Sequence, residues 1–299
     1  MSYSIGIVAY NEELNIQKLI NSLLLSNNIF GSLNELIIIS DGSTDSTVAR
    51  IKQIKNKKIV LIAKSKRRGK AIQENLLFQR CESEYLIILD ADILPDHDLI
   101  DLFLKEFADN SRLSLVSGRI QSVQPRTFVE RVLAHSQLIM QSIYQQIGEG
   151  NSIYTCNGRA LGYRKSFYKS IVLPKNIVAD DAYIYLNCIS KKYLYKQIQS
   201  AVVNYRLPCT LEDHYRQSAR FSSSQIQLQN FFPKEFLDTA FKIPKQTIAL
   251  AFQKALMANP LHTLTYLIIM VYIKLKYYLD KKVVYESRWK VSQSSKMIL

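Results

Sequence analysis

Apolar runs and amphipathic segments alternate regularly through the first third of the chain. Runs of β-favouring aliphatic residues predict strands at residues 4–9, 36–40, 58–63 and 85–89. Between them, apolar residues at helical spacing predict helices at 12–25, 45–54 and 69–80. Strands that are apolar throughout and joined to helices by short connections are typical of a largely parallel sheet covered by helices.

Beyond residue 95 the pattern becomes mixed. We expect a helix at 98–109, a strand at 113–123, a long helix at 127–148, and short strands and loops through 153–206. The chain shows no internal repeat. We therefore predict an α/β unit over 1–230, divided into halves 1–95 and 96–230, and a helical tail over 231–299.

The tail contains a long uncharged run. Residues 255–273 hold no Asp, Glu, Lys or Arg, although Asn259, Pro260 and His262 interrupt them, and the lysines that follow are Lys274, Lys276, Lys281 and Lys282. A spanning helix needs about 20 apolar residues. We expect this tail to be membrane-associated, as a single span or as a helix lying in the interface. The alternative is a pair of helices packed on the rest of the protein.

Composition narrows the classes of protein. The chain has 299 residues, 47% of them hydrophobic, which is enough for a sizeable core. The net charge of +14 suits nucleic acid, anionic lipid or a phosphorylated substrate, or a solvated lysine-rich surface. The four cysteines lack disulfide or metal-site spacing, and no secretory signal is evident at the N-terminus. We expect a reducing, cytoplasmic setting.

Aspartates follow the apolar runs directly. Asp41 ends the second run, Asp90 and Asp92 end the fourth, and Asp180 and Asp181 follow a later short one. Ligands of open α/β sheets bind beyond the carboxyl ends of the strands. One or two carboxylates together with substrate phosphates are what Mg²⁺ prefers. Because Asp90 and Asp92 are two residues apart, we expect one to take a metal and the other a sugar hydroxyl; the alternative is a pair of turn acids.

Four sequence blocks occur in order at characteristic separations. They are IGIVAYNEE (5–13), ISDGSTDST (39–47), RRGKAIQEN (67–75) and LDAD (89–92). From about residue 3 to 228, the chain resembles a family-2 glycosyltransferase of the GT-A fold, a Rossmann-like α/β fold with a mixed, mostly parallel sheet flanked by helices. The resemblance implies that 1–95 binds a nucleotide and that 96–230 binds the acceptor.

The resemblance also assigns roles on the donor side. It implies that Tyr10 packs on the base, that Asp41 accepts a hydrogen bond from the base edge, and that Lys70, with Arg68 nearby, meets the base or diphosphate. Asp90 would face the ribose or sugar, and Asp92 would ligate Mg²⁺ or Mn²⁺. The residues expected to bind the nucleotide-sugar are Tyr10, Glu12, Asp41, Arg68, Lys70 and Asp90.

On the acceptor side, the segment containing Gly158 and Arg159 resembles the family's acceptor-side glycine segment. Asp181 corresponds to the general base, and its neighbour Asp180 can raise its pKa by repulsion. The alternative is an acidic pair at a helix N-terminus. The motif of Gln217, Arg220 and Phe221 resembles the Gln-x-x-Arg-Trp motif of membrane-associated members, with Phe in place of Trp. The nearby His214 and Arg216 are candidates for further phosphate contacts.

The sequence therefore predicts an inverting, metal-dependent glycosyltransferase that uses a UDP-linked sugar and a glycan or lipid-linked acceptor at the cytoplasmic face of the cell membrane. A processive polysaccharide synthase subunit and a non-catalytic nucleotide-sugar-binding protein are the alternatives. We expect single transfer, because polymer synthases normally carry several spanning helices and this chain offers one or two. We expect no nucleic-acid partner, because the basic residues are spread along the chain without an aromatic-interleaved stripe.

Overall fold

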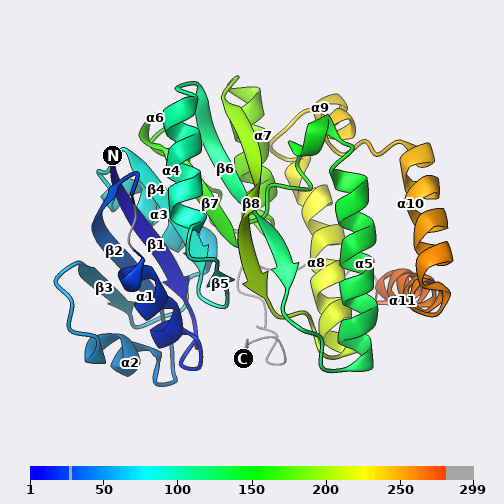
Figure 1. Ribbon diagram of the computed structural model, residues 1–299, viewed down its shortest axis with the longest axis horizontal. Coiled ribbons are helices and arrows are strands. Elements are labelled where there is room, and N and C mark those ends of the chain that lie inside the picture. Colours follow the sequence, from blue (N-terminus) through cyan, green and yellow to red (C-terminus); the bar gives the residue numbers. More distant parts are fainter. Residues whose placement is uncertain (27–28, 281–299) are drawn as a thin grey trace.

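The computed structural model describes residues 1–26 and 29–280, which form one mixed sheet with helices on both faces (Figure 1). The sheet has eight strands among the described residues, in the order β3-β2-β1-β4-β7-β6-β8-β5. The strands are β1 (Ser2–Ala9), β2 (Ser32–Asp41), β3 (Ile59–Lys64), β4 (Tyr85–Asp90), β5 (Leu94–Pro95), β6 (Leu113–Ser122), β7 (Ala160–Arg164) and β8 (Leu194–Tyr205). The main helices are α1 (Ile16–Leu25), α2 (Thr47–Gln53), α3 (Lys70–Arg80), α4 (Leu99–Asp109), α5 (Phe128–Tyr144), α6 (Lys165–Tyr168), α7 (Asp180–Ser190) and α8 (Leu211–Leu228).

Strands β1 to β4 pair in parallel, as the apolar runs predict. In β2, Leu36 and Ile38 belong to the core on one face of the sheet, while Ile37 and Ile39 belong to the core on the other face. All four side chains are fully buried. Burial on both faces explains why this strand is a continuous aliphatic run rather than an alternating one.

The first predicted helix begins later than expected. Asn11 has a φ of +55°, which ends β1 in a left-handed turn, and α1 starts only at Ile16. The Asn11 side chain accepts a hydrogen bond from the backbone N–H of Thr44 at 2.8 Å. The turn thereby ties the loop after β1 to the loop after β2, so both loops lie at the same edge of the sheet.

Residues 153–206, in the second half of the sheet, were expected to form only short strands and loops, and this expectation is wrong. This segment contains β7, the full helix α7 and the twelve-residue strand β8. β7 runs antiparallel to β4 and β6, whereas β8 runs parallel to β6 and antiparallel to β5. The alternation of β8 is irregular because its register with β6 shifts after Gly118, so its apolar positions do not follow a clean period of two.

The tail forms three helices within the described residues: α9 (Lys234–Ala240), α10 (Lys245–Ala258) and α11 (Pro260–Leu279). Ala251 and Ala255 of α10 pack on Ile139 and Ile143 of α5. α5, α8, α10 and α11 gather at the right of Figure 1, away from β1–β3. The predicted boundary at 230/231 falls in the turn between α8 and α9.

The uncharged run at 255–273 is divided between α10 and α11. Asn259 caps the second helix by accepting a hydrogen bond from the backbone N–H of His262, and Pro260 occupies the first turn. In the described part of the chain, no helix has the length and apolar character that crossing a membrane requires. Both helices pack on α5. Lys281 and Lys282 lie outside the described residues.

Candidate active site

A cavity of about 1210 Å³ lies at the carboxyl ends of β1, β2 and β4 and extends to α7, α8 and α11. Thirteen of the sequence-predicted site residues line it: Tyr10, Glu12, Asp41, Lys70, Asp90, Asp92, Gly158, Arg159, Asp180, Asp181, Gln217, Arg220 and Phe221. The structure thus gathers at one place residues that lie far apart in the sequence. The exception among the predicted residues is Arg68.

The donor end of the cavity is built around the loop before α3. Asp41 is buried and accepts hydrogen bonds from the backbone N–H groups of Arg68 at 2.9 Å and Gly69 at 2.8 Å, and from the Gln73 amide. These bonds fix the loop. They use both oxygens of the Asp41 carboxylate. The predicted hydrogen bond from a nucleotide base to Asp41 stays a prediction.

Arg67 and Arg68 point in different directions from this loop. The Arg68 side chain is exposed and lies outside the cavity lining, whereas the Arg67 guanidinium lies 4.0 Å from the centre of the Tyr10 ring. The close approach of Gly42 explains the loop path, since a Cβ at Gly42 would lie 2.5 Å from the Arg67 nitrogen. The cation that lies against Tyr10, the residue predicted to pack on the base, is therefore Arg67 rather than Arg68. The two arginines are adjacent in the sequence, and no sequence pattern distinguishes Arg67 from Arg68.

Glu12, which is also predicted to bind the sugar donor, is buried like Asp41. Its carboxylate accepts a hydrogen bond from Asn15 at 3.1 Å, and its backbone N–H donates to Thr47 at 2.7 Å. Glu12 therefore supports the turn that leads into α1, at the edge of the cavity.

Lys70 lies between the two halves of the site. Its ammonium is 2.9 Å from an Asp90 oxygen and 3.0 Å from an Asp180 oxygen, and it donates a longer hydrogen bond to the Gly158 carbonyl. Burial opposes its charge, but the negative charges of Asp180 and Asp90 raise the pKa of Lys70 well above its usual value. Lys70 thus ties the end of β4 to the start of α7, a contact that the motif spacing did not predict.

Asp90 and Asp92 face Arg159 from the end of β4. The Arg159 guanidinium lies 4.0 Å from Asp90 and 3.9 Å from Asp92, and it stacks 4.0 Å over the ring of Tyr205. Burial and the charge of Asp90 raise the pKa of Asp92, although Arg159 opposes this shift.

The acidic pair of β4 fits a divalent cation. A carboxylate with a raised pKa, beside a second carboxylate, is stabilised by a nearby cation. Among the described residues, no group of three or more acidic, His or Cys side chains forms a closed metal cage. An Mg²⁺ or Mn²⁺ site completed by substrate phosphates needs only one or two carboxylates, so the donor set at Asp92 is suitable.

Asp180 and Asp181 occupy the first turn of α7, as the alternative of an acidic pair at a helix N-terminus predicts. Asp181 accepts hydrogen bonds from the backbone N–H groups of Ala182 at 2.8 Å and Gly158 at 3.2 Å. Burial and the charge of Asp180 raise the pKa of Asp181 to about 6. Burial also acts on Asp180, but the charge of Lys70 outweighs it and lowers the Asp180 pKa. The environment thus keeps Asp180 ionised, whereas Asp181 can take a proton near neutral pH.

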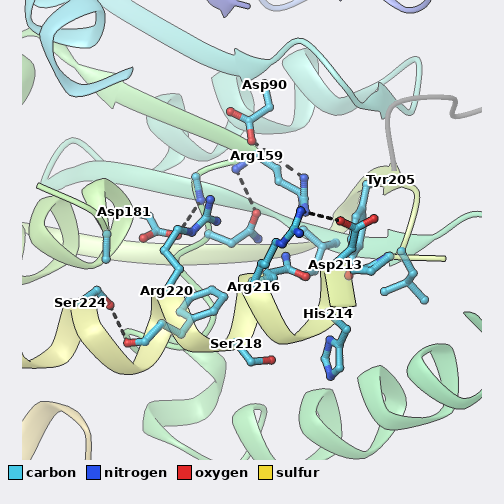
Figure 2. Close-up of a pocket in the computed structure, with 18 of the residues that line it drawn as sticks. Asp90, Arg159, Asp181, Tyr205, Asp213, His214, Arg216, Ser218, Arg220 and Ser224 are labelled. Atoms are coloured by element: carbon cyan, nitrogen blue, oxygen red, sulfur yellow. Dashed lines mark hydrogen bonds and ion pairs between the residues drawn. The ribbon is translucent and has the colours of Figure 1, made fainter. Parts of the chain in front are cut away.

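Helix α8 forms one wall of the cavity, beside Asp181. Figure 2 shows Arg216 and Arg220 rising from α8 toward Arg159 and Asp181. Burial lowers the pKa of Arg220, although Asp180 and Asp181 favour its charge. Phe221 is 55% exposed and lines the cavity from the same helix.

His214 lies on the side of α8 that faces away from Asp90 (Figure 2). Burial lowers the pKa of His214 to about 4, which makes it neutral at neutral pH. It therefore adds no positive charge for a phosphate there.

The structure also adds lining residues that the sequence did not suggest. Besides Arg67, these include Tyr205 from β8, Gln137 and Tyr144 from α5, and Tyr266 and Met270 from α11. The last two come from the tail, which therefore forms part of the cavity wall. No local motif marks Tyr266 and Met270, because they are an aromatic and an apolar residue within an ordinary helical pattern.

Comparison with known proteins identifies the family. The model of the glycosyl transferase family 2 matches residues 4–172, more than half of the chain, and the protein belongs to this family. The matched residues include all four of the sequence blocks on which the resemblance rests.

The particular relatives are distant. A poly-beta-1,6-N-acetyl-D-glucosamine synthase of Staphylococcus aureus is 24% identical over 232 residues, which are 76% of this chain and 55% of that protein. The chain therefore spans about half the length of the curated relatives it matches.

Solved structures of the same fold include two sugar transferases. A mannosyltransferase of Pyrobaculum calidifontis, in complex with GDP-Man and Mn²⁺, has a TM-score of 0.61 and 18% identity, covering 94% of this chain and 83% of its own. Glucosyl-3-phosphoglycerate synthase of Mycobacterium tuberculosis, in complex with Mn²⁺, UDP-Glc and phosphoglyceric acid, has a TM-score of 0.57 and 15% identity, covering 78% and 81%. At these identities the likeness supports the fold.

Proposed function

We propose that this protein is an inverting glycosyltransferase that moves a sugar from a UDP-linked donor to a hydroxyl of a glycan or lipid-linked acceptor. The observation that carries the proposal is the pair of unequal carboxylates at α7. Asp181 has a pKa of about 6, whereas Lys70 keeps its neighbour Asp180 ionised. A base that is free to accept a proton near neutral pH, inside a cavity lined by donor-type residues, is what direct glycosyl transfer requires.

In the proposed reaction, Asp181 takes the proton from the acceptor hydroxyl. The acceptor oxygen bonds to the anomeric carbon as the bond from that carbon to the diphosphate breaks, and inversion follows from attack on the opposite face. Arg220 and Arg159, both lining the cavity, stabilise the negative charge that develops on the leaving diphosphate. Tyr10 and Arg67 hold the nucleotide base.

Asp92, supported by Asp90, is the residue that would hold Mg²⁺ or Mn²⁺. When bound, the cation neutralises charge on the donor diphosphate. Two of the solved structures of this fold contain Mn²⁺ together with a nucleotide-sugar, which supports a divalent ion here. The carboxylate oxygens of Asp92 do not discriminate between the two metals.

A processive polysaccharide synthase is the second candidate. The observation that favours it is the matched relative that makes poly-beta-1,6-N-acetyl-D-glucosamine. The length of the product separates the two functions, because single transfer extends the acceptor by one residue and a polymerase gives a ladder.

We also propose that the enzyme works at the cytoplasmic face of the cell membrane as a peripheral protein. Large apolar side chains are exposed on α10 and α11, among them Met257 (80%) and Ile268 (70%), with the exposed Lys254 and Lys274 nearby. Helices with this arrangement lie in membrane interfaces. Co-sedimentation with phosphatidylglycerol vesicles should fall strongly in an M257E/I268E variant. Equal binding of both proteins would contradict the proposal.

The central test uses a panel of nucleotide sugars. The purified protein is incubated with UDP- and GDP-linked sugars and bacterial membranes or oligosaccharides, and nucleoside diphosphate release is measured with and without a chelator. We expect release from a UDP-sugar that the chelator stops and that added Mn²⁺ restores. Tight UDP binding without any release from every donor would instead indicate a non-catalytic nucleotide-sugar-binding protein.

A further inference from the structure

A second, smaller cavity adjoins the candidate active site. Its volume is about 250 Å³, below the ~300 Å³ at which drug-sized pockets begin, so it suits a single ring. Here we call it the amide cavity, after its lining residues Arg119, Ile120, Gln137, Met140, Gln141, Ser142, Tyr144, Gln145, Tyr154, Thr155, Asn157, Gln197 and Gln199.

The spacing of the amides brings them to one place. Gln137, Gln141 and Tyr144 are four and three residues apart and therefore share one face of α5. Gln197 and Gln199 of β8 lie side by side, because the Gln199 amide donates a hydrogen bond to Gln197 at 2.6 Å. The hydrogen bond from Gln145 to Gln197, 2.9 Å long, joins the two sides.

The amide nitrogens are already committed to the protein. Gln137 and Gln141 both donate to the carbonyl of Ile120, at 3.1 Å and 2.6 Å. Among the described residues, no donor contacts the Oε1 atoms of these two side chains. Gln199 likewise donates its nitrogen, to Gln197 at 2.6 Å. The Oε1 atoms of Gln137 and Gln141 are thus neutral acceptors on residues that line the cavity, and such acceptors suit hydroxyl donors.

The cavity is nearly free of charge. Arg119 is its one charged lining residue among the described residues, and its guanidinium already donates to the Gln199 carbonyl at 3.0 Å and to Gln121 at 3.2 Å. Tyr144 and Tyr154 stack with ring centres 4.7 Å apart and add apolar faces. Neutral acceptors beside aromatic rings match a hydroxyl-rich uncharged sugar, whereas an anionic ligand would need free cations.

The amide cavity leads to the proposed base. Ile120, Gln137, Met140, Tyr144 and Asn157 line both cavities. Asn157 directly precedes Gly158, whose backbone N–H donates to Asp181. An acceptor with one sugar ring in the amide cavity would thus extend into the active-site cavity, toward the proposed base Asp181.

We infer that the amide cavity binds a neutral sugar ring of the acceptor, so that the acceptor is an uncharged oligosaccharide rather than a phosphorylated small molecule. This inference rests on the proposed glycosyltransferase function and specifies its acceptor class. The hydroxyls of the ring donate to Gln137 and Gln141, and its apolar face packs on Tyr144.

The test measures binding of defined probes to the full chain by calorimetry and saturation-transfer NMR, in the presence of UDP and Mn²⁺. The probes are neutral di- to tetrasaccharides of glucose and of N-acetylglucosamine, and glucose 6-phosphate as the anionic counterpart. Gln141→Leu should weaken the neutral glycan that binds by roughly three- to tenfold, as expected for one neutral hydrogen bond. Ser142→Trp, at an exposed rim position, should fill the cavity and abolish binding even if loss of the Gln141 amide destabilises the protein.

Gln146→Leu is the matched control, because Gln146 follows α5 but is exposed and outside the lining. Its glycan affinity should equal that of the unmodified protein, and UDP affinity should be unchanged in all three variants. Binding of glucose 6-phosphate alone, absence of binding by every neutral probe, or equal glycan binding by all variants would overturn the inference. If the unmodified protein does not bind UDP, the proposed function is contradicted instead. Glycan binding that Ser142→Trp abolishes would still support the amide cavity as a sugar-binding site.

Discussion

The two halves of the catalytic unit are built differently. In residues 1–95, four parallel strands follow one another with short connections, and each motif block sits at the end of its own strand. In residues 96–230, antiparallel pairings of β7 separate neighbouring parallel strands, and the site residues come from the start of α7 and from α8. The nucleotide half is thus organised by local repetition, and the acceptor half by contacts between distant segments.

This difference assigns different chemistry to each half. In the proposed nucleotide half, the loop before α3 is tied down by Asp41, which binds its backbone N–H groups. In the proposed acceptor half, the pKa of the proposed base Asp181 depends on its neighbour Asp180 and on Lys70 from the other half. Changes on one side should therefore alter binding of the donor, and changes on the other should alter catalysis.

Replacing the base gives the sharpest separation of the two halves. Asp181→Asn should reduce transfer by about 10²–10⁴-fold, because a positioned base contributes that factor. UDP binding, measured by calorimetry, should persist, since the donor contacts lie in the other half. Asp109→Asn, an exposed carboxylate at the end of α4, is the control and should behave like the unmodified enzyme. Loss of UDP binding in Asp181→Asn would remove the distinction.

The converse change acts on the donor. Asp92→Ala should weaken metal-dependent UDP binding by about a hundredfold, because the cation that neutralises the diphosphate loses its protein ligand. Calorimetry with and without Mn²⁺ measures the effect. The Mn²⁺-independent part of the affinity should be retained, and an unchanged response to Mn²⁺ would place the ion elsewhere.

Lys70 links the halves, so its removal should cost stability as well as activity. Lys70→Met leaves Asp90 and Asp180 without their shared counter-charge and should lower the free energy of unfolding by about 3 kcal/mol. Urea denaturation measures this change. Adding Asp180→Asn should recover part of the loss, and strictly additive effects would show that the two residues are not coupled.

The pH dependence should report the acceptor half. Because the raised pKa of Asp181 is about 6, the carboxyl is ionised and active above that pH and protonated below it. The value of kcat/KM should therefore fall about tenfold per pH unit below pH 6. The residual transfer of Asp181→Asn should lack this limb; if the limb persists unchanged, another group such as Asp92 is responsible.

The smallest expected effect distinguishes two adjacent residues of the donor loop. Arg67→Ala should weaken UDP binding about two- to fivefold, since a cation over an aromatic ring contributes ~0.5–1 kcal/mol at an exposed site. Arg68→Ala should leave it unchanged, because that side chain points to solvent and its backbone N–H is retained. Calorimetric titration with UDP measures both affinities. Weaker UDP binding by Arg68→Ala but not by Arg67→Ala would support the original prediction for Arg68.

Much of the donor side was predictable because its signals are local. A continuous aliphatic run such as β2 specifies a strand buried on both faces, and a polar residue at its end must then lie at the sheet edge where ligands bind. The positions of Asp41, Asp90 and Asp92 follow from this rule. Asp181 was found through its motif, although the expected loop around it is the first turn of α7.

The sequence alone determined where the first strands lie along the chain, which acids follow them and which family the chain resembles, because periodicity and spacing act over a few residues. Only the tertiary structure decided that Arg67 rather than Arg68 enters the cavity, that Lys70 joins Asp90 to Asp180, and that the tail packs on α5. It alone also brought the glutamines of α5 and β8 together around a second cavity. These features arise from contacts between segments far apart in the chain, and the pattern of residues within one segment carries no information about its distant partner.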